Sequence, residues 1–121
     1  MPSLTKRRPY SPTSSLLKIA NATAYSDALK LTDDKDTAVG ILCEAANLYI
    51  EIKRYQSAEK CLKKALSYGK NDNVTGLLIN MGVALGNDRN YSEAVRIFEY
   101  ALNNSQSSEL KQLIYNKIFI I

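Results

Sequence analysis

Apolar side chains recur every three or four residues along most of this chain, and polar residues separate them. Val39, Leu42 and Ala46 follow this spacing, and so do Ala58 and Leu62. The spacing gathers the apolar residues on one face of a helix, so it predicts an all-α protein with about six helices. We expect an N-terminal helix at about 13–31, two helices in each of the segments at about 37–70 and 73–104, and a C-terminal helix at about 108–121.

Two stretches of the chain repeat one another. The segment RYQSAEKCLKKAL (Arg54–Leu66) has Tyr, Ala, Ala and Leu at the same places as NYSEAVRIFEYAL (Asn90–Leu102), and their starts lie 36 residues apart. At the same offset, LLINM (Leu77–Met81) is matched by LIYNK (Leu113–Lys117). Self-similarity with a period of about 20–50 residues is typical of proteins built from stacked units. The sequence therefore predicts an α-solenoid of antiparallel helix hairpins.

Polar residues mark where several of these helices begin. Asn90 and Glu93 have the spacing of a capping box, in which each side chain bonds a backbone N–H of the first turn. The polar residues at 71–73 are suited to close one unit and cap the next. In the N-terminal helix, Ala28 and Leu31 continue an apolar helical spacing. We therefore expect this helix to pack against the first hairpin.

Small and large apolar residues alternate at matching positions of the two units. Small side chains allow neighbouring helices to approach to about 8–10 Å. The matching positions are Leu42, Ala46, Tyr49, Ala58, Leu62 and Ala65 in the first unit, and Leu78, Gly82, Leu85, Ala94, Phe98 and Ala101 in the second. The pattern resembles the tetratricopeptide repeat (TPR), a helix–turn–helix unit of about 34 residues. The chain departs from that family in its longer period and in the missing proline at the end of each unit.

The resemblance implies protein binding through a concave groove lined by the first helix of each unit. The implied lining residues are Glu44, Asn47 and Glu51 in the first unit, Ile79, Asn80, Val83 and Asn87 in the second, and Gln112, Tyr115, Asn116 and Phe119 in a C-terminal half unit. Amide side chains both donate and accept hydrogen bonds, so Asn47, Asn80 and Asn116 would form a row that suits a bound peptide backbone. The alternative is that these asparagines only face solvent.

With 121 residues, the chain has room for one domain, and its 45% hydrophobic and 23% charged residues are ordinary for a globular protein. The net charge of +4 is a mild excess. Lys6, Arg7 and Arg8 make the segment at about 1–12 basic, which predicts a flexible arm on a cytoplasmic protein. An organelle address, for a mitochondrion or plastid, is the alternative, since transit peptides are also basic and poor in acidic residues. No apolar run is long enough to span a membrane.

The residue types that catalysis and metal binding need are scarce. The chain has no histidine and only two cysteines, Cys43 and Cys61, and it lacks a glycine-rich loop for phosphate. Because the cysteines align with isoleucines of the second unit, we expect them at apolar packing sites, with a reactive thiol as the alternative. We predict that the chain is not an enzyme and needs no metal and no cofactor.

Three lysines, Lys60, Lys63 and Lys64, lie within one turn of the second helix of the first unit. They predict a charged outer face. Together with the basic N-terminal residues they could contact RNA, so an RNA- or ribosome-associated basic α-solenoid is the alternative function. Aromatic residues for base stacking are not interleaved with these lysines, and we expect nucleic-acid binding less than protein binding.

The chain ends in the apolar run Ile118–Ile121. The outer face of a terminal repeat is normally polar, because no neighbour covers it. This run therefore folds back over the stack, docks on a partner or a second copy of the chain, or belongs to a longer repeat protein. Together these features predict a non-catalytic protein-interaction module that acts as an adaptor, a scaffold, or a small subunit or assembly factor of a larger complex.

Overall fold

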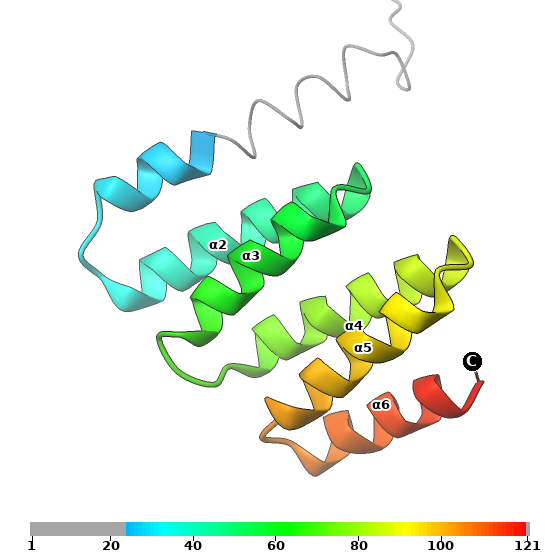
Figure 1. The fold of residues 1–121 in the computed structure, drawn as a ribbon. Coiled ribbons are helices and arrows are strands. Elements are labelled where there is room, and N and C mark those ends of the chain that lie inside the picture. The colour runs from blue at the N-terminus through cyan, green and yellow to red at the C-terminus, as the bar shows by residue number, and fades with distance from the viewer. Residues whose placement is uncertain (1–23, 121) are drawn as a thin grey trace, which may run out of the picture.

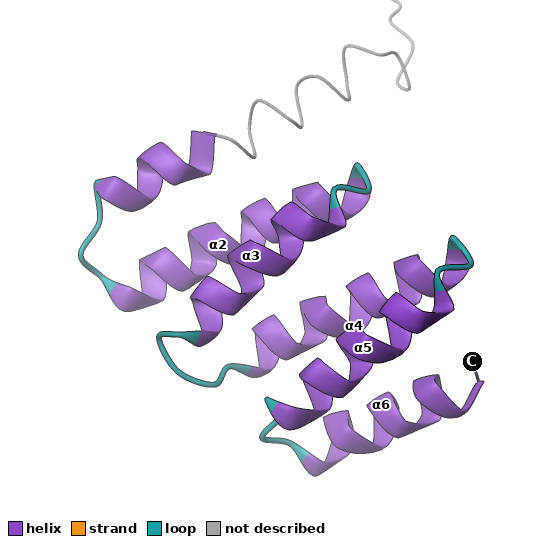
Figure 2. Cartoon of the chain, in the orientation of Figure 1, coloured by secondary structure: helices purple, strands orange, loops and turns teal. Residues whose placement is uncertain are grey.

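The computed structural model describes residues 24–120, and every regular element in that range is a helix (Figures 1 and 2). The elements are a helical segment at 24–30 and the helices α2 (Lys35–Glu51), α3 (Tyr55–Leu66), α4 (Asp72–Asn87), α5 (Tyr91–Asn103) and α6 (Ser108–Ile120). The all-α class predicted from the sequence is therefore confirmed. The predicted arm at 1–12 and part of the predicted N-terminal helix, 13–23, lie outside the described residues. Within 24–120, none of the helices has the length and apolar character that crossing a bilayer requires.

Consecutive helices form antiparallel hairpins that lie side by side (Figure 1). The most extensive contacts join α2 to α3 and α4 to α5, and α4 also contacts both helices of the first hairpin. The last helix, α6, contacts α4 and α5. It is therefore placed on the second hairpin as α4 is placed on the first, and it takes the position of the first helix of a third unit.

Small side chains lie where the helices cross. All of the predicted packing residues are buried except Tyr49, which is half-buried. Ala46, Ala58 and Ala94 are completely buried. At Gly82 even a methyl group is too large, because a Cβ atom placed there lies 2.5 Å from a ring carbon of Phe98. The close contact between α4 and α5 thus depends on the absence of a side chain at Gly82.

The turn within each hairpin has the same backbone conformation. Lys53 and Arg89, which lie 36 residues apart, have left-handed φ values of 63° and 67°. In the first turn, the N–H of Arg54 donates to the C=O of Tyr49 over 2.8 Å, and the N–H of Lys53 donates to the C=O of Ile50 over 3.0 Å. The equivalent bonds recur in the second turn. This pattern is a Schellman motif, and here it closes α2 and α4 without the glycine usually found at the left-handed position.

Side chains cap α2 and α4 at their N-termini. Asp34 accepts hydrogen bonds from the backbone N–H of Thr37 over 3.0 Å and from the Thr37 hydroxyl over 2.6 Å. These bonds lower the pKa of the Asp34 carboxyl, because they favour its ionised form. At the start of α4, Asn71 accepts a hydrogen bond from the N–H of Asn73. Each cap satisfies a backbone donor that has no partner within its helix.

The start of α5 differs from the sequence prediction. The capping box predicted there is wrong, because the Asn90 side chain makes no cap hydrogen bond. Glu93, the second member of the predicted box, instead accepts hydrogen bonds from the Arg96 guanidinium, the shortest over 2.8 Å. A charged donor binds a carboxylate more strongly than a backbone N–H does. Arg96 therefore draws Glu93 away from the helix terminus.

The helical segment at 24–30 packs on the first hairpin through residues other than those predicted. Leu29 packs against the hydrophobic core, and the Tyr25 hydroxyl donates to the Glu44 carboxylate over 3.3 Å. Leu31, predicted to continue the apolar face, is 87% exposed. The helix ends at residue 30, so the helical periodicity that would turn Leu31 toward α2 stops one residue too early.

Candidate functional site

The predicted groove residues of α2 lie on the surface. Glu44, Asn47 and Glu51 are all exposed. Glu44 is nevertheless engaged, since its carboxylate is the acceptor of the hydrogen bond from Tyr25. The segment at 24–30 thus already contacts the α2 part of the predicted groove.

The predicted groove residues of α4 lie beside the last helix, although two of the four stay exposed. We call them the α4 stripe: Ile79, Asn80, Val83 and Asn87. A hollow of about 330 Å³ lies between the first half of this stripe and Leu110 and Leu113 of α6. A second hollow of about 330 Å³ lies between the other half and Lys117 and Ile120 of α6. Helix α6 therefore borders both halves of the α4 stripe.

The placement of α6 changes the role of Ile79. This side chain is only 5% exposed and belongs to the hydrophobic core. Its prediction as a residue open to a partner is wrong, because the core and α6 cover it. Val83 is half-buried, whereas Asn80 and Asn87 remain exposed. Only the polar half of the α4 stripe is accessible.

The matching residues of α6 are uncovered. We call them the α6 stripe: Gln112, Tyr115, Asn116 and Phe119, all of which are exposed. Tyr115 and Phe119 stand 36 residues after Ile79 and Val83. Tyr115 is 55% exposed and Phe119 is 91% exposed. The equivalent helix face is thus partly covered on α4 and open on α6, where it carries two aromatic rings.

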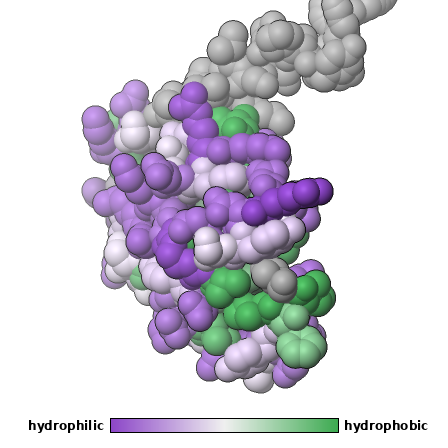
Figure 3. Space-filling model, turned by 45° about the vertical axis from the view of Figure 1, so that its right-hand side comes forward, coloured by the Kyte–Doolittle hydropathy of each residue, from purple (hydrophilic) through white to green (hydrophobic). Residues whose placement is uncertain are grey.

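Further apolar residues enlarge this surface. Ile120 is 78% exposed, and the exposed Tyr91 lines the same hollow. Leu113, earlier on α6, is also exposed. In Figure 3 the green hydrophobic surface gathers over the lower part of the molecule, where α6 lies. Sequence reasoning missed Tyr91, because its match with Tyr55 indicated the same environment. The hydroxyl of Tyr55 bonds to Asp88 in the turn of the next unit, and no such turn follows Tyr91 within the described residues.

The apolar C-terminal run is divided between core and surface. Ile114, one turn earlier, is completely buried, and Ile118 packs partly against the core. Phe119 is 91% exposed, whereas Ile120, although 78% exposed, lines the hollow next to Val83 and Phe98. Ile121 lies outside the described residues. Folding back over the stack therefore accounts for Ile118 but not for its two neighbours.

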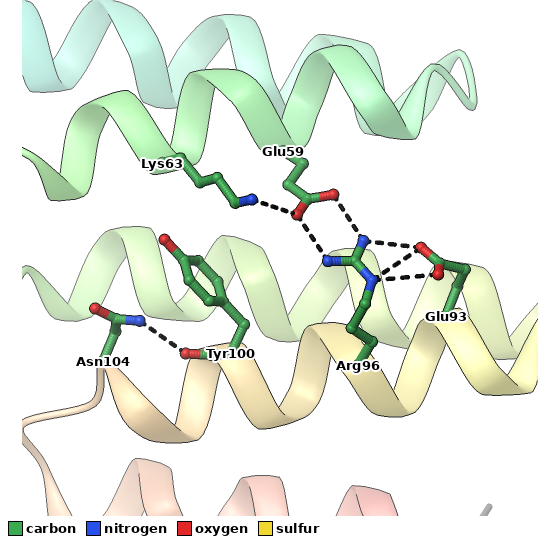
Figure 4. A network of polar contacts seen from close by, with 6 residues as sticks. All are labelled: Glu59, Lys63, Glu93, Arg96, Tyr100 and Asn104. Carbon is green, nitrogen blue, oxygen red and sulfur yellow. Dashed lines mark hydrogen bonds and ion pairs between the residues drawn. The ribbon is translucent and has the colours of Figure 1, made fainter.

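A charged network joins the outer helices of the two hairpins (Figure 4). The Arg96 guanidinium donates two hydrogen bonds to the Glu59 carboxylate, over 2.8 and 2.9 Å, and also binds Glu93. Lys63 approaches the same Glu59 carboxylate to 3.1 Å and lies 5.5 Å from the ring centre of Tyr100. Hydrogen bonding from Arg96 lowers the pKa of Glu59 to about 2. The network is a structural link between α3 and α5.

The network also reduces the positive charge of the predicted basic face. All three lysines are exposed, and Lys60 and Lys64 make this face positive. The charge of Lys63 is balanced by Glu59, which is shared with Arg96. This face therefore attracts a phosphate backbone less than the run of lysines indicated.

A second polar link joins the two hairpin turns. The carboxylate of Asp88 accepts hydrogen bonds from the Tyr55 hydroxyl over 2.8 Å and from the Lys53 ammonium over 3.0 Å. These two donors lower the pKa of Asp88, the tyrosine bond contributing most. Burial, with the bond to Asp88, raises the pKa of Tyr55 to about 12. Both the outer helices and the turns of the two hairpins are thus tied together by polar bonds.

The two cysteines are unpaired and half-buried. Burial raises the pKa of the Cys43 and Cys61 thiols, so little thiolate forms near neutral pH. Both side chains pack against the core. Within residues 24–120, no three side chains of the metal-binding types His, Cys, Asp and Glu are grouped to hold an ion.

Comparison with known proteins does not assign the chain to a family. No family model matches it. No curated protein and no solved structure shows significant similarity to it. The tetratricopeptide resemblance therefore stays a prediction, based on the repeat in the sequence. The candidate site is defined by the geometry of α6 alone.

Proposed function

We propose that this chain is a non-catalytic protein-interaction module, which acts as an adaptor, a scaffold, or a small subunit or assembly factor of a larger complex. The observation that supports the proposal is the α6 stripe, on which Phe119 is 91% exposed and Tyr115 55% exposed. Ile120, 78% exposed, extends the same apolar surface.

Burial of the exposed apolar side chains supplies the free energy of binding. Fully burying one large apolar side chain is worth roughly 1.5–3 kcal/mol. Phe119 and Ile120 leave most of that free energy unused in the isolated chain. Aromatic residues are also enriched at protein interfaces, where a few of them supply most of the binding free energy. The α6 stripe contains no charged residue, so a partner can cover it without desolvating an ion.

The RNA-binding alternative has less support. It depends on the basic outer face of α3, where Glu59 balances part of the charge. The ring of Tyr100 already lies 5.5 Å from the Lys63 ammonium. We therefore do not propose this function.

Affinity isolation from the native source tests the proposal. The baits are the wild-type chain, the double variant Tyr115→Ala/Phe119→Ala, and the matched control Tyr68→Ala/Leu31→Ala, which removes two exposed apolar side chains elsewhere. We expect wild type and control to retain the same protein at salt concentrations from about 0.1 to 0.5 M, because apolar contacts are not screened. The double variant should lose it. Equal recovery by all three baits, or recovery of nucleic acid that falls steeply with salt, contradicts the proposal.

A further inference from the structure

We propose that the α6 stripe binds an amphipathic α-helix of a partner protein, laid along α6 as α6 is laid along α4. This inference rests on the proposed function and specifies the partner's structure. The face of α4 that α6 partly covers shows how such a helix fits.

On α4, the cover is a helix. The α4 stripe lies against α6, with Leu110 and Leu113 near its first half and Lys117 and Ile120 near its second half. These four residues are separated by three, four and three positions, which is the spacing of one helix face. Ile79, which lines the same hollow as Leu110 and Leu113, is only 5% exposed. The fold therefore shows which kind of element fits this face.

On α6, the same face has no cover. Tyr115 and Phe119 take the places of Ile79 and Val83 at an offset of 36 residues, and both are exposed. An aromatic side chain buries about 150–250 Å² when it is covered. Replacing two aliphatic residues by two aromatic ones makes the uncovered face the larger apolar surface of the two.

The residues of the α6 stripe define the partner's chemistry. A helix that lies along α6 must place aliphatic side chains over Tyr115 and Phe119, with spacing like that of Leu110, Leu113 and Ile120. Gln112 and Asn116 lie between the rings and can hydrogen-bond polar side chains at the edge of that helix. Docking of an apolar helix face with three- and four-residue spacing is a common mode of recognition.

A second copy of this chain does not supply such a helix. Its Leu110, Leu113 and Ile120 already lie beside its own α4, and its Ile114 is completely buried. Offering this face to another copy requires α6 to leave the second hairpin. A partner protein that carries a free amphipathic helix therefore fits this face better than α6 of a second copy does.

A synthetic helix tests the inference directly. The probe is a peptide with the sequence Ser108–Ile120, which carries the side chains that α6 presents to α4. A covalent staple between its positions 111 and 115, which are exposed in the fold, holds the peptide helical and lowers the entropic cost of binding. The control peptide carries Leu113→Asp. Binding to the whole chain is followed by NMR of the backbone amides, and sedimentation gives the oligomeric state.

We expect saturable shifts at residues 112–119 with the probe and none with the control peptide. In the chain, Phe119→Ala should weaken binding at least about tenfold, as for a central interface aromatic, whereas Tyr68→Ala should leave it unchanged. Circular dichroism checks that both variants fold, which we expect because both side chains are exposed.

Three results overturn the inference. The first is the absence of shifts at about 1 mM peptide, the weak limit of specific binding. The second is shifts centred on Ile79 and Val83, which show that the probe has displaced α6. The third is a doubled mass that depends on Phe119, which makes a second copy the occupant. If the probe does not bind but affinity isolation still depends on Phe119, the proposed function is supported and the inference that the partner is a helix is rejected.

Discussion

Two glycines of α4 give a test in which opposite results are expected from the same substitution. Replacing a mid-helix glycine by alanine normally stabilises a helix by about 1 kcal/mol. At Gly76 nothing lies within 4 Å of the added methyl group, so we expect Gly76→Ala to raise the unfolding free energy by about 0.5–1 kcal/mol. At Gly82 the added methyl group meets three ring atoms of Phe98 at 2.5 to 2.8 Å.

The magnitude at Gly82 follows from packing. Carbon atoms prefer separations of about 3.5–4.0 Å, so the Phe98 ring must move by about 1 Å. The ring is 1% exposed, so moving it disturbs a tightly packed site, even though Phe98 and Gly82 also line the hollow next to Val83. Overpacking of this kind typically costs about 1–3 kcal/mol. After the gain in helix propensity, we expect Gly82→Ala to destabilise the chain by about 1–2 kcal/mol.

Urea unfolding followed by circular dichroism measures both variants. Because the propensity gain is common to both, the difference between them isolates the clash and should equal the typical overpacking cost of about 1–3 kcal/mol. In the double variant Gly82→Ala/Phe98→Leu, the smaller leucine replaces the ring, so the unfolding free energy should recover in part. Equal stability of Gly76→Ala and Gly82→Ala would refute the close crossing of α4 and α5.

Three further predictions concern turns, charges and caps. Arg89→Gly should raise the unfolding free energy by about 0.5 kcal/mol relative to Arg89→Ala, because glycine relieves left-handed strain at some entropic cost; equal urea midpoints contradict this. The Glu59 pKa of about 2 lies below its ordinary value of 4.5, so its contribution is full above about pH 4.5 and disappears toward pH 2. Since Arg96 is 46% exposed, we expect that contribution to be only about 1 kcal/mol, and a stability difference between wild type and Glu59→Gln that is constant from pH 7 to 2 contradicts it. Asp34→Ala should cost about 1 kcal/mol by removing the bonds to Thr37; unchanged thermal melting would exclude the cap.

The helices could be predicted because helix crossings impose a recurrent requirement on side-chain size. Ala58 and Ala94 are completely buried at equivalent places, and only small residues fit there. The same logic explains why the bounds of α4 and α5 agree closely with the pattern. The two turns resemble each other for another reason. The backbone hydrogen bonds that close them recur, although the side chains at the left-handed position, Lys53 and Arg89, are not involved in those bonds.

The candidate site was only partly predictable, because periodicity identifies a helix face but not the neighbour that covers it. Ile79 and Tyr115 occupy equivalent positions, yet one is buried and the other is exposed. The Glu59–Arg96 bond was missed for a related reason. Its partners stand 37 residues apart, which is not the repeat period, and many exposed charges on α3 and α5 offered alternative pairs.

The two polar links and the apolar attachment of α6 make different parts of the chain sensitive to different ions. Sodium chloride screens the contact between Glu59 and Arg96 and so loosens the first hairpin from the second. Sulfate strengthens the burial of Ile114 and so tightens α6. In hydrogen exchange, we therefore expect sulfate to protect α6 more than chloride does at equal ionic strength.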